Sequence, residues 1–257
     1  MISTLGDWGL KKLKNFCYAA GFMLKVLREV TNITGRNKIG FNVLVMQILF
    51  TGVNALRIIA IFSLALGAVI IVQGSSILQQ LGQRDFLYPI LISVITREGG
   101  PLLTALVVMS RSGVAIATEL GNMVVKHEIE AYISVGIDPF NYLLVPRLLG
   151  VTISTMLLTI YFNVMGLGAS FIFAQLLAPI PFSEYFRNLM INLSLNDLII
   201  SLVKSFFFGV IIALVSSYNG LSVQNATTEI PVVTIKAVGQ GFALIFLFNV
   251  ILTLVRF

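Results

Sequence analysis

Long blocks of apolar residues dominate the chain beyond residue 40, and shorter polar stretches separate them. An α-helix needs about 20 such residues to cross a hydrocarbon layer roughly 30 Å thick. Because the membrane interior offers no water to the backbone, we expect these blocks to be helical. The pattern predicts an all-α membrane protein with five spans, at about 58–78, 87–108, 148–177, 198–215 and 237–255.

A shorter apolar stretch at 43–56 precedes the first span, and Gln47, Gly52 and Asn54 interrupt it. It is too short to cross a membrane alone. We therefore expect it to be interfacial or a broken lead-in to the first span.

An amphipathic pattern covers residues 8–30. Its apolar face carries Leu13, Phe16, Cys17, Ala20, Leu24 and Leu27, and its basic face carries Lys11, Lys14 and Lys25. Such a helix suits the membrane interface, although a helix packed on a soluble partner would show the same pattern. The polar stretch at 31–40 predicts a loop. We therefore divide the chain into an N-terminal interfacial segment with its loop, residues 1–40, and a transmembrane domain, residues 41–257.

The composition supports this division, because 57% of the residues are hydrophobic and only 11% are charged. Typical soluble domains contain about 25% charged residues. Most of the 17 lysines and arginines lie on one side of the predicted spans, many of them ahead of the first span. This asymmetry is typical of the positive-inside rule rather than of a nucleic-acid groove. It predicts a cytoplasmic N-terminus and a C-terminus outside the cytoplasm.

Single residues narrow the possible chemistry further. Cys17 is the only cysteine and His127 the only histidine, so we expect neither an intrachain disulfide nor a metal site. Lys204 lies within the fourth predicted span, near its outer end. We expect its long side chain to snorkel to the interface, with contact to a lipid phosphate as the alternative.

The second predicted span contains two adjacent charges, Arg97 and Glu98. Charges at that depth are costly and usually face a partner, a cavity or a ligand. Gly99, Gly100 and Pro101 follow them, and this sequence allows a kink or a break in the helix. Charge and irregularity together favour a substrate cavity. The alternative is an ion pair with another helix that only fixes packing.

An amphipathic helix is predicted at about 118–135, in the cytoplasmic loop after the second span. Gly136 is well placed as a left-handed C-cap, and Asp138 before Pro139 can begin the next helix. A short helix held by a sharp turn between two spans could transmit a movement of a cytoplasmic partner to those spans. A loop helix that lies on the membrane is the alternative.

The segment 97–147 resembles the MlaE-type permease family of ABC transporters. The resemblance rests on the runs EGGPLLTAL (98–106), ATELGNM (117–123), EIEA (128–131), GIDP (136–139) and LVPR (144–147), together with Arg111. The chain departs from the family's common pattern at Met109, Ser110 and Val114, and at Glu128 and Glu130, where the family often has Gln and Asp. These changes keep the acidic helix, so they bear on the identity of the partner more than on transport.

The resemblance implies a homodimeric permease in the bacterial inner membrane, with five spans per subunit and a separate cytoplasmic ATPase. Its further partners would be a substrate-binding protein with an MCE domain and, in some members, a small STAS-domain protein. Its substrate would be phospholipid or a related lipid, moved between the inner membrane and the outer envelope. The chain contains no G-x-x-x-x-G-K-[ST] motif, so any ATP would be used by the partner.

Two sets of residues are candidates for this function. We assign lipid binding to Arg97 and Glu98, with apolar contacts from Leu78, Ile90, Leu91, Val94 and Leu102. We assign ATPase coupling to Glu119, Met123, Glu128, Ile129 and Glu130.

Two other functional classes are alternatives to an ABC transporter permease. An ion-coupled secondary transporter would also need charges such as Arg97 and Glu98, but it would work without an ATPase. An intramembrane enzyme would need a nucleophile with a base, or a metal cluster, inside the spans. The sequence offers no such set, and we expect no catalytic residue in this chain.

Overall fold

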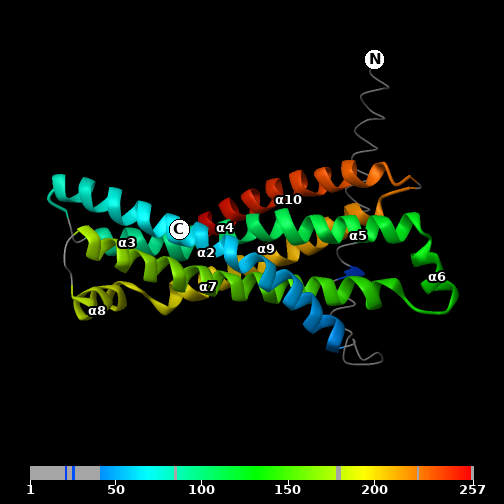
Figure 1. Cartoon of the computed structure of the whole chain (residues 1–257), viewed down its shortest axis with the longest axis horizontal. Helices are drawn as coiled ribbons and strands as arrows, with labels where there is room; N and C mark the ends of the chain where they lie inside the picture. The colour runs from blue at the N-terminus through cyan, green and yellow to red at the C-terminus, as the bar shows by residue number, and fades with distance from the viewer. Residues whose placement is uncertain are drawn as a thin grey trace, which may run out of the picture.

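The computed structural model describes residues 21, 25–26, 41–83, 86–177, 181–224 and 226–255. The amphipathic segment predicted at 8–30 lies almost entirely outside these residues. Within them, five helical stretches are long and apolar enough to cross a membrane, as the sequence predicted. They run side by side along the long axis of an elongated bundle (Figure 1).

The helices fall into spans and short connecting elements. The first span is α2 (Phe41–Gln80), and the second joins α3 (Leu87–Ile92), η2 (Ser93–Gly99), α4 (Gly100–Val108), η3 (Met109–Gly113) and α5 (Val114–Val125). The third joins η4 (Phe140–Leu144) and α7 (Val145–Leu177), while α9 (Leu195–Leu221) and α10 (Glu229–Leu254) are the fourth and fifth. Two short helices, α6 (Glu128–Ser134) and α8 (Phe182–Asn192), lie at opposite ends of the bundle (Figure 1).

The prediction of a separate apolar stretch before the first span was wrong, because α2 is one continuous helix of 40 residues. Of the polar positions that suggested an interruption, Gln47 and Gly52 are partly buried against α7, whereas Asn54 is exposed. Gln47 packs so closely on Gly150 of α7 that a Cβ there would lie 2.6 Å from its Cγ. Ser154 of α7 donates a hydrogen bond to the Ile48 carbonyl. At 1.5 Å per residue α2 exceeds the thickness of a bilayer, so it must tilt or extend beyond it.

The second span contains two π-helical segments, η2 and η3, and no break. Gly99 closes η2 with a backbone so tight that a Cβ would lie 2.6 Å from the Val94 carbonyl oxygen. Pro101 lies in the first turn of α4, directly after η2, and a proline inside a helix lacks one N–H donor and crowds the preceding turn. The glycines and the proline therefore permit a widened turn, and such turns frequently mark functional sites.

The predicted helix at 118–135 is in fact two helices. Thr118 to Val125 complete α5, and the chain then turns at His127, which has a left-handed φ of 58°. Helix α6 begins at Glu128 and is followed by Gly136, whose φ of 78° confirms the expected left-handed cap. Asp138 accepts a hydrogen bond from the Phe140 backbone N–H and so caps η4 as predicted.

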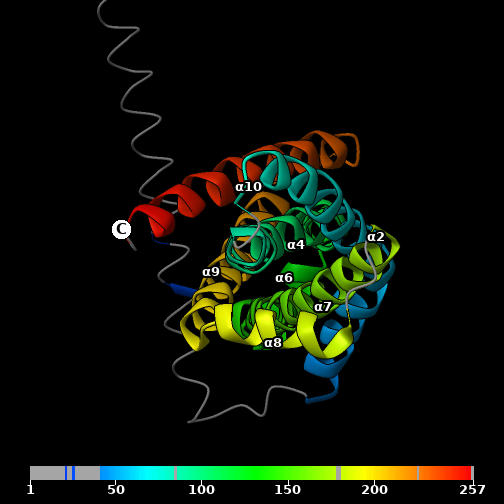
Figure 2. The same ribbon diagram turned by 90° about the vertical axis from the view of Figure 1, so that its left-hand side faces the viewer.

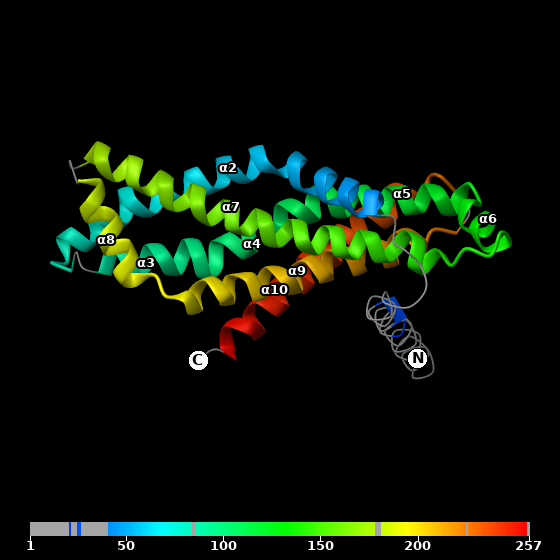
Figure 3. The same cartoon turned by 90° about the horizontal axis from the view of Figure 1, so that it is seen from below.

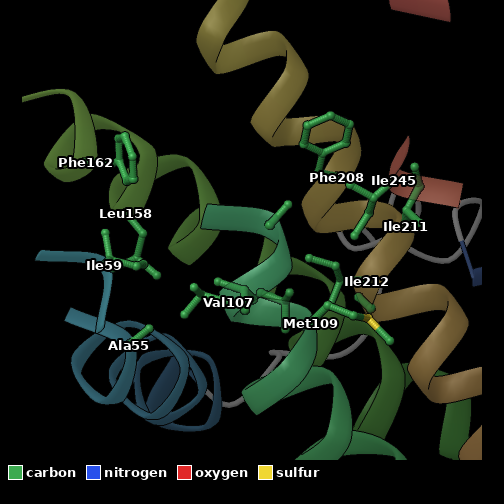
Figure 4. Packing of buried hydrophobic residues seen from close by; sticks show 14 of the residues in the cluster. Ala55, Ile59, Val107, Met109, Leu158, Phe162, Phe208, Ile211, Ile212 and Ile245 are labelled. Atoms are coloured by element: carbon green, nitrogen blue, oxygen red, sulfur yellow. The ribbon is translucent and has the colours of Figure 1, made fainter. Parts of the chain in front are cut away.

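Helix α7 packs on both α2 and α9 in the interior of the bundle, and 72% of its most apolar stretch is buried. Figure 4 shows apolar side chains of five spans meeting there, with Phe162 of α7 and Phe208 of α9 fully buried. The α2 and α7 backbones approach closely at Gly67, where a Cβ would lie 2.5 Å from the Gly166 carbonyl oxygen. In contrast, α10 lies at the edge of the bundle (Figure 2), and only 17% of its most apolar stretch is buried.

Candidate functional site

Four charged side chains of the membrane spans form two ion pairs between η2 and α9. Arg97 Nε lies 2.7 Å from Asp197 Oδ1, and Lys204 Nζ lies 2.7 Å from Glu98 Oε1. Neighbouring residues on a helix point roughly 100° apart, so Arg97 and Glu98 cannot share one partner. Asp197 and Lys204 are seven residues apart, about two turns, and therefore lie on one face of α9. The two pairs contain two positive and two negative formal charges.

Glu98 is also bound by the fifth span. Asn249 Nδ2 donates to Glu98 Oε2 over 3.3 Å, and Thr253 Oγ1 donates to Glu98 Oε1 over 3.3 Å. Lys204 Nζ donates to Thr253 Oγ1 as well, over 2.9 Å. This network ties η2, α9 and α10 together at the point where α10 ends, partway along the bundle (Figure 1). This geometry matches the alternative interpretation of the sequence, an ion pair that fixes helix packing. We call this network the structural tether.

The prediction that Lys204 snorkels to the interface was wrong. Its side chain is only 2% exposed, and it is bound by two partly exposed partners, Glu98 and Thr253. Glu98 supplies a counter-charge over a short distance, which makes burial of the ammonium group tolerable. Sequence spacing along one helix could not identify this partner, because Glu98 is 106 residues away.

The Arg97 pair resembles the Glu98 pair in exposure, since Lys204 is 2% and Glu98 38% exposed, but it differs in its hydrogen bonds. Asp197 is fully buried, whereas 34% of the Arg97 side chain is exposed. The Nε to Oδ1 contact is short but poorly aligned with the N–H bond, so it is an ion pair rather than a good hydrogen bond. Within the described part of the chain Arg97 has no second protein partner. Its terminal nitrogens are therefore available to an anion.

The structure places the five apolar residues of the predicted lipid site in different surroundings. Leu91 is fully buried and Leu78 is 8% exposed, so both belong to the core in this conformation. Ile90 and Val94 are 40% and 37% exposed and share one face of the second span. Leu102 is partly buried against the core. Ile90 and Val94 are thus the members of this set with surface to offer an acyl chain.

The predicted coupling residues are divided between α5 and α6. Glu119 of α5 pairs with Arg147 of α7, its Oε1 lying 2.8 Å from Arg147 Nη2, so its charge is already used within the chain. Met123 packs against the core from α5, and Glu128, Ile129 and Glu130 lie on α6. His127 Nδ1 and Glu130 Oε2 are 3.1 Å apart at the exposed turn before α6.

Apolar side chains around the end of α6 add a feature that the sequence analysis missed. They are Ile133, Val135, Ile137 and Tyr142, which are 61%, 71%, 38% and 49% exposed. Beside them lies a cavity of about 470 Å³, lined by Ile129, Ile133 and Phe140 among others, with Lys25 Nζ 3.9 Å from the centre of the Phe140 ring. The signal was present in the sequence as apolar residues within a loop. Only the structure shows that these side chains are exposed.

A second cavity, of about 560 Å³, lies between α7, α8 and α9 at the other end of the bundle. Figure 3 shows α8 crossing the ends of these two spans. The lining of this cavity is almost wholly apolar and includes Phe171, Phe186 and Leu202. Tyr185 contributes its ring, while its hydroxyl donates to the Leu167 carbonyl, and burial raises the pKa of this hydroxyl above its usual range. The described residues contain no cluster of three or more metal-ligating side chains.

Comparison with known proteins is consistent with this architecture. The family described as Permease MlaE matches residues 44–255. A probable ABC transporter permease protein of Rickettsia felis is 26% identical over 253 residues, which cover 98% of this chain and 97% of the relative. A similar protein of Rickettsia typhi is 27% identical over 82% of both chains. The chloroplast protein TRIGALACTOSYLDIACYLGLYCEROL 1 of Arabidopsis thaliana is 25% identical over 85% of this chain and 62% of its own length.

Proposed function

This chain belongs to the MlaE family of ABC transporter permeases, and we propose that it moves phospholipid or a related lipid between the inner membrane and the outer envelope. Membership in this class implies ATPase partner subunits. The observation that carries the lipid proposal is Arg97, a partly exposed arginine held inside a membrane span with its terminal nitrogens available. An arginine fork matches phosphate oxygens, and a phosphate leaving water needs such a donor.

Two further observations support a lipid substrate. Val94 and Ile90, about one and two turns before Arg97 on the same span, present apolar surface beside its charge. The Arabidopsis relative is named for trigalactosyldiacylglycerol, which is a glycerolipid. A combination of apolar surface with a single available cation suits an amphipathic substrate better than a free ion, so we prefer lipid transport to the ion-coupled alternative.

We further propose how the partners are arranged. The ATPase would dock on α6, where Glu128, Glu130 and the exposed apolar residues Ile133 and Val135 offer both charge and apolar surface. Two copies of the chain would form a homodimer, and an MCE-domain protein and a small STAS-domain protein would complete the assembly. The N-terminus would be cytoplasmic and the C-terminus external.

The lipid role of Arg97 is tested with a charge-balanced variant. Replacing Arg97 alone would remove the positive charge beside the buried Asp197, so we choose Arg97→Met together with Asp197→Asn. This double variant should keep its fold and lose most of the phospholipid that co-purifies with the full-length chain. Arg187→Met, which removes an exposed arginine of α8, is the matched control and should retain the lipid. Normal lipid retention and normal transport in the double variant would exclude Arg97 as the lipid ligand.

A further inference from the structure

Asp197 has surroundings that fix its carboxylate in place. It is fully buried and occupies the third position of α9 in a capping box. The Ser194 backbone N–H donates to Asp197 Oδ2 over 3.2 Å, and the Asp197 N–H donates to Ser194 Oγ over 3.3 Å. Moving this carboxylate away from Arg97 would break the start of the fourth span. The carboxylate of Asp197 is therefore held beside Arg97.

The contact with Asp197 uses only one part of the guanidinium group. A guanidinium has about five N–H donors, of which Nε carries one, so most of them remain on the terminal nitrogens. The short contact between Nε and Asp197 Oδ1 keeps the guanidinium group beside this carboxylate and so restricts the Arg97 side chain. An anion at the terminal nitrogens would thus meet an arginine that is already aimed, at a smaller cost in conformational entropy.

The same carboxylate weakens the attraction that the anion feels. Glu98 and Lys204 balance each other, so Asp197 is the charge that offsets Arg97. Coulomb interactions are strong where water is excluded, and a buried carboxylate close to a bound phosphate repels it. A transported substrate has to leave as well as bind, and very tight binding of the substrate slows turnover.

From this geometry we infer that Asp197 is a positioning residue of the lipid site, which aims Arg97 at the lipid phosphate and lowers the affinity so that the lipid is released. The inference rests on the proposed lipid role of Arg97. Removing the charge of Asp197 while keeping its shape should make phosphate-bearing lipids bind more tightly. It should leave lipids without a phosphate unaffected.

The experiment compares the wild type with Asp197→Asn, which retains an oxygen acceptor. Each full-length protein is extracted in mild detergent with the subunits that co-purify. It is then titrated with dioctanoyl phosphatidylglycerol and, separately, with dioctanoylglycerol, which has the same chains and no phosphate. We expect Asp197→Asn to bind phosphatidylglycerol about tenfold more tightly. Its affinity for dioctanoylglycerol should equal that of the wild type. Lipid release, followed by dilution, should be slower by a similar factor.

Glu184→Gln is the matched control, because it removes one exposed carboxylate of α8 and should change neither affinity. If Asp197→Asn does not fold, Asp197→Ser keeps an acceptor for the Ser194 N–H and must show the same tightening. An unchanged or weaker affinity for phosphatidylglycerol, or equal tightening for both lipids, overturns the inference.

The double variant Arg97→Met with Asp197→Asn separates the inference about Asp197 from the proposed lipid role of Arg97. If it binds phosphatidylglycerol like the wild type, the lipid role of Arg97 fails. If it binds poorly while Asp197→Asn shows no tightening, only the inference about Asp197 fails.

Discussion

At the scale of single residues, the adjacent charges Arg97 and Glu98 have different surroundings and different expected roles. Glu98 accepts from Lys204, Asn249 and Thr253, so its oxygens are occupied by protein donors. Arg97 has one ion-pair partner, although the two side chains are similarly exposed, Arg97 by 34% and Glu98 by 38%. The sequence analysis treated the two as one lipid site. We therefore propose Arg97 as the ligand and Glu98 as a structural residue.

We predict that Glu98→Gln destabilises the protein far more than an exposed substitution does. The variant leaves the Lys204 ammonium group buried without a counter-charge, which typically costs about 3–5 kcal/mol. Thermal unfolding in detergent should show a clear fall in the midpoint. Adding Lys204→Met should restore much of the loss, and Glu184→Gln should have little effect. A Glu98→Gln protein as stable as the wild type would show that the tether contributes nothing.

At the scale of helices, small residues decide how closely the spans approach. Gly67 of α2 faces the backbone of α7, whereas Gly168 of α7 has nothing within 4 Å of the position of a Cβ. These two glycines therefore differ in packing although both lie inside long helices. Sequence alone gives them the same helix propensity.

We predict opposite results for alanine at these two positions. Gly67→Ala would place a methyl group 2.5 Å from the Gly166 carbonyl oxygen, which forces α2 and α7 apart and should cost about 1–3 kcal/mol. Gly168→Ala adds no clash and should be neutral or stabilising, because alanine favours a helix by up to about 1 kcal/mol over glycine. The unfolding midpoints of the two variants measure this difference. Equal midpoints would contradict the close packing of α2 on α7.

A second prediction at this scale concerns α6 as the docking element for the ATPase. Glu128→Lys with Glu130→Lys reverses two charges on α6, and charge complementarity chiefly governs association. The amount of ATPase subunit that co-purifies should fall, with no change in the thermal stability of the permease. Glu184→Lys, on α8 at the far end of the bundle, is the control. Undiminished co-purification and transport in the α6 variant would refute the assignment.

At the scale of the whole molecule, two of the five spans leave wide apolar faces uncovered. Only 28% of the most apolar stretch of α2 and 17% of that of α10 are buried. Figure 2 shows α10 and part of α2 on the same edge of the bundle, across α4. Lipid can cover such faces, and so can a second subunit. The proposed homodimer would place these two spans at or near the two-fold axis and enclose a cavity for the lipid.

We predict that cysteines on the open faces of α2 and α10 form cross-links between subunits in native membranes. Suitable positions are Ile61 and Leu247, which are 65% and 54% exposed, in a background where Cys17→Ser removes the native thiol. Ile191→Cys on α8, also strongly exposed, is the control and should remain monomeric on a non-reducing gel. The proposed dimer would be rejected if a series of cysteines along both faces gave no cross-linked product.

The sequence by itself determined the class of the protein and its five spans, because apolar blocks of this length have one stable form in a bilayer. It also determined the left-handed position of Gly136 and the cap at Asp138, since turn chemistry acts over a few residues. Only the tertiary structure decided that Lys204 pairs with Glu98 and Asp197 with Arg97. These partners come from different helices, and the rotation of one span against another is fixed by packing, which no local pattern encodes. The continuity of α2 likewise depends on tertiary contacts, since Gln47 packs on Gly150 of α7 and Ser154 of α7 donates to the Ile48 carbonyl.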